Sequence, residues 1–181
     1  MSKGNPDKAM AALLPLPIRV SGGYSVNPMT LGMFAALERI KSPLVNPDIH
    51  DGDMLDLIPS LYLLTHDPLE VFKADLIVAS MDWANTVPPT ILAEIQTAAY
   101  KQINAALDVV PEKKKDDSHG GHDGWIAALV YFAAETLHWS YEEIMWRAPL
   151  GAICLLRRRE ELKKGKIFPL STIEKMDNGD T

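Results

Sequence analysis

The chain of 181 residues carries a formal net charge of −6, with 47% hydrophobic and 23% charged residues. These values indicate a soluble globular protein of one domain, with or without arms, and the acidic balance does not favour a dedicated nucleic-acid-binding protein. The single cysteine, Cys154, excludes an internal disulfide, and no stretch has the pattern of a signal peptide or the length of a membrane span. The sequence therefore predicts a cytoplasmic protein that makes no use of a membrane.

Residues 1–27 show little periodicity, and we expect them to form a flexible N-terminal arm. A first helix is predicted to begin at Asn27 and Pro28, because a side-chain cap followed by proline is typical of a helix start. Pro43 is expected to end it. Its apolar stripe consists of Leu31, Phe34, Leu37 and Ile40.

Three more helices are predicted before residue 110. The second covers residues 53–64, where Pro59 is expected to kink the helix or to move its start downstream. The third begins with the cap Asp67 and Pro68 and continues without a break to Trp83, because apolar residues recur at three and four positions. The fourth begins at Pro88 and Pro89. Its apolar stripe consists of Ile91, Ile95, Ala99, Ile103 and Leu107.

Residues 111–123 contain lysine, aspartate, glycine and histidine with almost no apolar residue, which indicates a polar linker or loop. This linker separates an N-terminal helical part, residues 28–110, from a C-terminal part, residues 124–164. Residues 165–181 are expected to be a tail. With no convincing strand, the predicted fold is all-α: a compact bundle of about seven helices, in a four-helix part and a three-helix part.

The C-terminal part is predicted to contain three helices joined by short turns. Residues 125–137 are apolar on nearly every face, as in a helix buried by several neighbours. Ser140 and Glu143 have the spacing of a capping box, which predicts that a short helix begins there. Ala148 and Pro149 are expected to end it and to start the last helix.

We predict no catalytic, cofactor-binding or metal site, and therefore no enzyme. His119, His122 and Asp123 are too few donors, in a glycine-rich segment, for a transition-metal site. Residues 50–53 are similar to the start of a calcium loop, but apolar residues follow where further oxygen ligands are needed. Cys154 stands on an apolar helix face, where core packing is a better interpretation than a nucleophile.

The most promising surface for a partner lies in the C-terminal part. Aromatic residues serve both as core anchors and as interface residues, and we assign Trp125 to the core. The predicted partner-binding residues are Trp139, Trp146, Leu155, Arg157 and Arg158. The arginines at 157–159 allow two interpretations, a charged outer face or a basic helix that enters a DNA groove.

Three stretches resemble the tail assembly chaperones of long-tailed phages. Residues 31–44 are similar to their opening helix, which ends in a Leu-Glu-x-Ile-x-Ser-Pro turn. Residues 56–64 are similar to the leucine-rich helix that follows in that family. Residues 139–146, with Pro149 and Leu150 and then residues 155–157, are similar to its ending of a short helix, a proline-leucine pair and a final helix.

The resemblance implies a non-enzymatic role in the host cytoplasm, binding the tape measure protein and tail tube subunits while the tail is assembled. Whether the protein also forms a homo-oligomer is left open. Such chaperones are often made in two lengths by ribosomal frameshifting, and the lysines at 113–115 are a candidate position for the slippery codons. The alternative function is a small helical DNA-binding or packaging adaptor that uses Arg157, Arg158 and Arg159.

Overall fold

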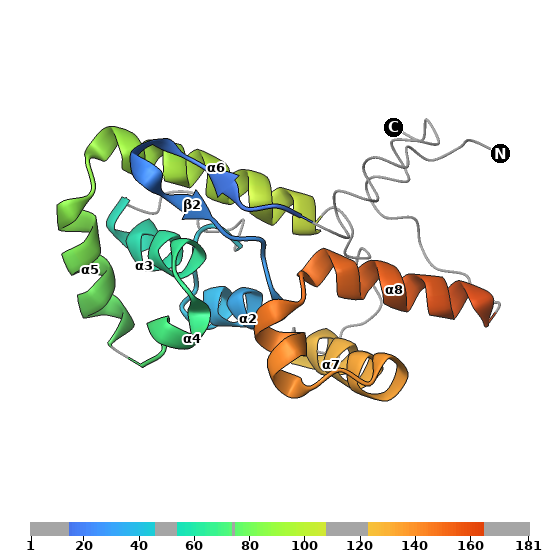
Figure 1. The fold of residues 1–181 in the computed structure, drawn as a ribbon. Coiled ribbons are helices and arrows are strands. Elements are labelled where there is room, and N and C mark those ends of the chain that lie inside the picture. The colour runs from blue at the N-terminus through green and yellow to red at the C-terminus, as the bar shows by residue number, and fades with distance from the viewer. Residues whose placement is uncertain (1–14, 46–53, 74, 108–122, 165–181) are drawn as a thin grey trace, which may run out of the picture. The chain divides into compact units, whose positions relative to one another are not determined.

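The computed structural model describes residues 15–45, 54–73, 75–107 and 123–164. Apart from one small two-stranded ribbon, the regular elements in these ranges are helices, which confirms the all-α fold class (Figure 1). The chain divides into two compact units, one of residues 16–104 and one that includes residues 123–164. Within the described residues, no helix is both long and apolar enough to cross a bilayer.

Helix α3 (Met54–Thr65) is the centre of the first unit. It packs against four elements, which are β2 (Ser25–Val26), α2 (Leu31–Arg39), α4 (Pro68–Val71) and α5 (Leu76–Thr86). A helix with neighbours on several sides needs apolar residues around its circumference, and Leu61, Leu63 and Leu64 are all completely buried. The helix continues through the buried Pro59 instead of starting after it.

The end of α2 is a Schellman motif, which explains the turn before Pro43. Lys41 has a left-handed backbone with φ of 53°. Its N–H donates to the carbonyl of Glu38 at 3.0 Å, and the N–H of Ser42 donates to the carbonyl of Leu37 at 2.9 Å. The carbonyls of Leu37 and Glu38 at the end of α2 are therefore satisfied, and the chain reverses so that Ser42 lies inside the unit.

A buried pair of hydroxyl groups joins this turn to α3. Ser60 Oγ donates to Ser42 Oγ at 2.7 Å, and the N–H of Leu44 donates to the same oxygen at 3.2 Å. Ser42 is 1% exposed and Ser60 is 0% exposed. Because each group is out of reach of water, the contact fixes α2 and α3 in one register.

The first helix does not begin at Asn27, as the sequence predicted. Its N-cap is Thr30, whose Oγ1 accepts the N–H of Met33 at 3.3 Å. Asn27 serves the end of α3 instead: its N–H donates to the carbonyl of Leu64 at 2.8 Å, and its Nδ2 donates to the carbonyl of His66 at 3.2 Å. A capping residue can satisfy a helix that is distant in sequence, and the local pattern does not reveal this.

Residues 15–27, expected to belong to a flexible arm, form a packed β-ribbon. Strand β1 (Ile18–Arg19) pairs antiparallel with β2 around the 3-10 turn η1 (Ser21–Gly23), where Gly22 and Gly23 have positive φ. Helix α6 (Pro89–Leu107), which confirms the predicted fourth helix, lies beside this ribbon (Figure 1). The buried Gln102 donates to the carbonyls of Leu16 at 2.8 Å and Val26 at 3.4 Å.

The predicted third helix is two helices. Asp67 is the expected cap, since its Oδ1 accepts the N–H of Leu69 at 2.9 Å. Helix α4 ends at Val71, however, and Asp75 caps a separate helix α5 by accepting the N–H groups of two residues. The continuous stripe expected through Phe72 is therefore interrupted, and Phe72 is 47% exposed.

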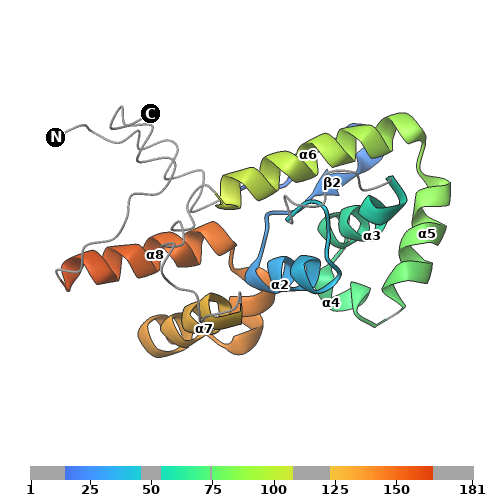
Figure 2. The same ribbon diagram turned by 180° about the vertical axis from the view of Figure 1, so that it is seen from behind.

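The second unit consists of α7 (Asp123–Leu137), the π-helix η2 (Glu143–Arg147) and α8 (Leu150–Lys163). Helix α7 packs against both of the others (Figure 2). It buries Leu129, Phe132 and Ala133, but Tyr131 is 69% exposed, so the helix is not buried on nearly every face as expected. The expected linker and tail lie outside the described residues, except that Asp123 begins α7.

The buried hydroxyl pair predicts a graded loss of stability. Ser42→Ala should lower the free energy of unfolding by about 2 kcal/mol, because two buried donors lose their acceptor. Ser60→Ala should cost about 1 kcal/mol, because it removes one donor and leaves Ser42 Oγ still accepting from the N–H of Leu44. Urea denaturation followed by circular dichroism measures both. Thr97→Ala, which removes an exposed hydroxyl on α6, is the matched control. A loss of stability in Ser42→Ala no larger than that in Thr97→Ala would contradict the prediction.

Candidate functional site

The predicted partner residue Trp139 lies directly after the end of α7. His138 has a left-handed backbone with φ of 56°, which ends the helix. The N–H of Trp139 then donates back to the carbonyl of Ala133 at 3.3 Å. This backbone bond holds the half-buried Trp139 at the C-terminal end of α7.

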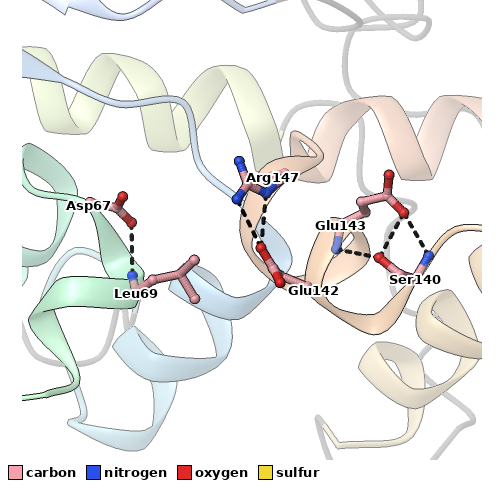
Figure 3. A network of polar contacts seen from close by, with 6 residues as sticks. All are labelled: Asp67, Leu69, Ser140, Glu142, Glu143 and Arg147. Carbon is pink, nitrogen blue, oxygen red and sulfur yellow. Dashed lines mark hydrogen bonds and ion pairs between the residues drawn. The ribbon is translucent and has the colours of Figure 1, made fainter.

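The capping box predicted from the sequence is present (Figure 3). The N–H and the Oγ of Ser140 donate to Glu143 Oε2 at 2.8 and 2.7 Å, and the N–H of Glu143 donates to Ser140 Oγ at 3.3 Å. The two hydrogen bonds from Ser140, side chain first and backbone second, lower the pKa of Glu143. The box thus starts the short helix at the expected position.

This short helix has the wide turn of a π-helix, which the sequence did not predict. The N–H of Ala148 donates to the carbonyl of Glu143, five residues earlier, at 2.8 Å. On the surface, Arg147 donates through Nε at 3.1 Å and Nη2 at 2.9 Å to Oε1 of Glu142, also five residues earlier (Figure 3). Single π turns occur frequently at functional sites. The predicted partner residue Trp146 lies within this one and is half-buried.

Helix α8 begins in the core of the unit. Its first five residues, Leu150 to Cys154, are all buried. Burial raises the pKa of the Cys154 thiol to about 12, while the positive charge of Arg157 acts in the opposite direction. Cys154 is therefore a packed core residue, as expected, and the protonated thiol is a poor nucleophile.

The three consecutive arginines do not form a uniform basic face. Arg157 and Arg158 are half-buried, and only Arg159 of the three is exposed. Beyond them, Lys163 donates to Glu160 at 2.5 Å and lowers the pKa of that carboxyl. This mixture of charges favours the interpretation as a charged outer face, and DNA contact by the arginines stays a prediction.

All five predicted partner residues belong to the second unit. Two lie at the turn after α7 and in η2, and three lie on α8; each is half-buried. Sequence reasoning missed the large apolar residues that the unit exposes most. These are Tyr131, Tyr141 and Leu162. Tyr131 lies within an apolar run, so no local signal marks it as exposed. Tyr141 precedes two glutamates and Leu162 stands between Glu161 and Lys163, and these charged neighbours are signals of exposure.

The described residues contain no group of three or more histidine, cysteine, aspartate or glutamate side chains that could hold a metal ion. The metal-site candidates dismissed earlier, His119 and His122 and the turn at 50–53, lie outside those residues. A scan against protein-family models, a search of curated proteins and a search of solved structures each find no match to the chain. Function therefore has to be inferred from the side chains and from the resemblance stated above.

The capping box predicts a pH dependence at Glu143. Its folded-state pKa is lowered, so its contribution to stability is present above the ordinary glutamate pKa and is lost as the pH falls through the lowered value. Ser140→Ala should raise the pKa of Glu143 toward its ordinary value, as measured by an NMR titration of the carboxyl carbon. Glu160, whose pKa is lowered by Lys163, should not change. An unchanged Glu143 in the variant would contradict the role of Ser140.

Burial of Cys154 predicts an inert thiol. With a pKa of about 12 in place of 9.0, the thiolate fraction near pH 8 falls about a thousandfold. Ellman's reagent should therefore react very slowly with the native protein and completely in denaturant. Cys154→Ala is the blank for nonspecific colour, and reaction of the native protein at the denatured rate would show that the thiol is accessible.

Proposed function

We propose that the protein is a non-enzymatic tail assembly chaperone of a phage or prophage, which binds the tape measure protein, tail tube subunits or both during tail assembly. The observation that carries the proposal is the exposure of large apolar side chains on both helical units. Exposed apolar side chains that lie together commonly mark a protein-binding site, and Ile77 and Val78 are adjacent on one helix. A protein that holds a partner only until assembly proceeds needs such a surface and needs no catalytic group.

Two of the residues in the motifs that carry the resemblance have a structural role in this fold. The Ser-Pro turn that carries it contains Ser42, and the leucine-rich helix that carries it contains Ser60. These two residues form the buried hydrogen bond between α2 and α3. Two stretches compared separately in the sequence therefore act together in the fold, which gives a physical reason for both.

The expected partner chemistry is helical. Amphipathic helices bind other proteins by placing an apolar stripe on a complementary apolar surface. In the second unit, such a partner would have Tyr131 and Tyr141 as exposed aromatic contacts. Two half-buried rings are also available, Trp139 just after α7 and Trp146 within the π-helix. Tyrosine and tryptophan, together with arginine, are enriched among the side chains that dominate the binding energy of protein interfaces.

Co-expression tests the proposal. A tagged chain should co-purify with the tape measure protein of the same phage or prophage, and it should increase the soluble fraction of that protein. Tyr131→Ser together with Tyr141→Ser should reduce co-purification, because both side chains are exposed and their loss leaves the core intact. Thr97→Ala, on the first unit, is the control that should not change it.

Absence of any complex and of any gain in solubility with the wild-type chain would refute the chaperone proposal. The alternative, a DNA-binding or packaging adaptor, predicts a mobility shift with duplex DNA at low salt that disappears as salt is raised. Replacing the exposed Arg159 by Gln should weaken that shift. A shift without co-purification would favour the adaptor over the chaperone.

A further inference from the structure

Helix α5 exposes apolar residues on its outer side. Ile77 is 53% exposed and Val78 is 58% exposed, while the polar Ser80 is completely buried. Helices on protein surfaces usually have the reverse arrangement, with polar residues outward. Met81, one turn after Ile77, is half-buried on the same side. We call Ile77, Val78, Met81 and Asp82 the α5 outer face.

The inner side of α5 is fixed in place. Trp83 packs edge-to-face against Tyr62 of α3, with ring centroids 5.6 Å apart. Ser80 Oγ donates to the carbonyl of Ile77 at 2.9 Å, so the buried hydroxyl is satisfied within the helix. The helix cannot turn Ile77 and Val78 inward without exposing Trp83. The packing of the unit therefore fixes which side of α5 faces outward.

Two carboxylates stand at the ends of the apolar pair. Asp75 precedes it and accepts the N–H groups of Ile77 at 3.0 Å and Val78 at 3.2 Å, and the exposed Asp82 follows one turn after Val78. Helix α5 contains no lysine or arginine. Among the described residues neither aspartate has an ion pair, and the nearby Lys73 pairs with Glu70 at 2.6 Å. The apolar pair Ile77 and Val78 is therefore flanked by a negative charge on each side.

We propose that the α5 outer face binds an amphipathic helix whose apolar stripe is flanked by lysine or arginine. The inference rests on the proposed chaperone function and deepens it, because it names the chemistry of the segment that the partner presents. Charge complementarity selects such a partner over an acidic helix and over DNA. A second copy of this chain would bring the same carboxylates to the face, so like charges oppose self-association there.

A helix fits the surface better than a strand. Ile77, Val78 and Met81 form a ridge along α5, and ridges of one helix pack into the grooves of another. An extended partner would instead need an unpaired strand edge to supply its hydrogen bonds, which an α-helix does not offer. The apolar pair supplies the contact area, and the aspartates select the sign of the flanking charge.

Binding of designed peptides tests the proposal directly. The probe is a fluorescein-labelled helix of about 18 residues with a leucine stripe flanked by lysines, which is long enough to be helical. Two companions have the same leucine stripe flanked by glutamates, or the same composition with the stripe scrambled. Fluorescence anisotropy with the full chain should show binding of the lysine-flanked helix and weaker or no binding of the others.

Substitutions on α5 test whether the peptide binds to this helix. Ile77→Ser with Val78→Ser should weaken binding of the lysine-flanked helix about tenfold, because its apolar anchor is lost. Asp82→Asn should weaken it about threefold at low salt and less at high salt. Leu55→Ser and Asp56→Asn, both exposed on α3, are the matched controls and should leave binding unchanged.

Equal binding of both charged helices, or full binding by the Ile77→Ser, Val78→Ser variant, would overturn the proposal. So would a dimer in sedimentation that this variant abolishes, since the face would then join two copies. The co-purification experiment separates the two proposals. If the α5 variant co-purifies with the tape measure protein as fully as the wild-type chain does, this inference fails while the chaperone function stands. If the wild-type chain never co-purifies, the function fails and the peptide result decides the surface.

Discussion

The first unit depends on one buried contact, the hydrogen bond from Ser60 to Ser42. Two hydroxyl groups in an apolar interior are costly unless they pair, and they pair in only one register of α2 against α3. The left-handed Lys41 is what turns Ser42 inward to make the bond. Because α3 also packs against α4, α5 and β2, fixing its register positions every other element in contact with it.

The exposed apolar residues of α5 follow from that arrangement. Helix α5 reaches α3 through the rings of Trp83 and Tyr62, and Tyr24 adds a further edge-to-face contact to Trp83 with centroids 6.4 Å apart. In the described residues the buried indole nitrogen of Trp83 has no acceptor, so ring packing rather than a hydrogen bond holds the helix. With Trp83 inward, helical geometry places Ile77 and Val78 outward.

Local signals in the sequence predicted local structure, and contacts between distant residues decided the rest. The caps at Asp67 and at Ser140 with Glu143 were found because cap and helix are adjacent in the chain. Asn27 was assigned to the wrong helix because its partner, the end of α3, lies almost 40 residues away. The β-ribbon was missed for a similar reason, since Gln102 holds it from α6. Of the candidate site, the sequence predicted the short helix that carries Trp146 but not its π geometry.

The α5 outer face and the pair Trp139 and Trp146 differ in the source of the binding free energy that a partner could gain from them. A half-buried side chain such as Trp139 has already lost part of its contact with water, whereas Ile77 and Val78 still expose more than half of theirs. Apolar area that a partner removes from water contributes about 25 cal/mol per Å², so exposed residues offer the larger gain for their size. Trp139 and Trp146 offer large, preordered rings instead, whose binding costs little side-chain entropy. The α5 outer face is thus suited to supply hydrophobic affinity, and Trp139 and Trp146 of the second unit are suited to supply shape selectivity.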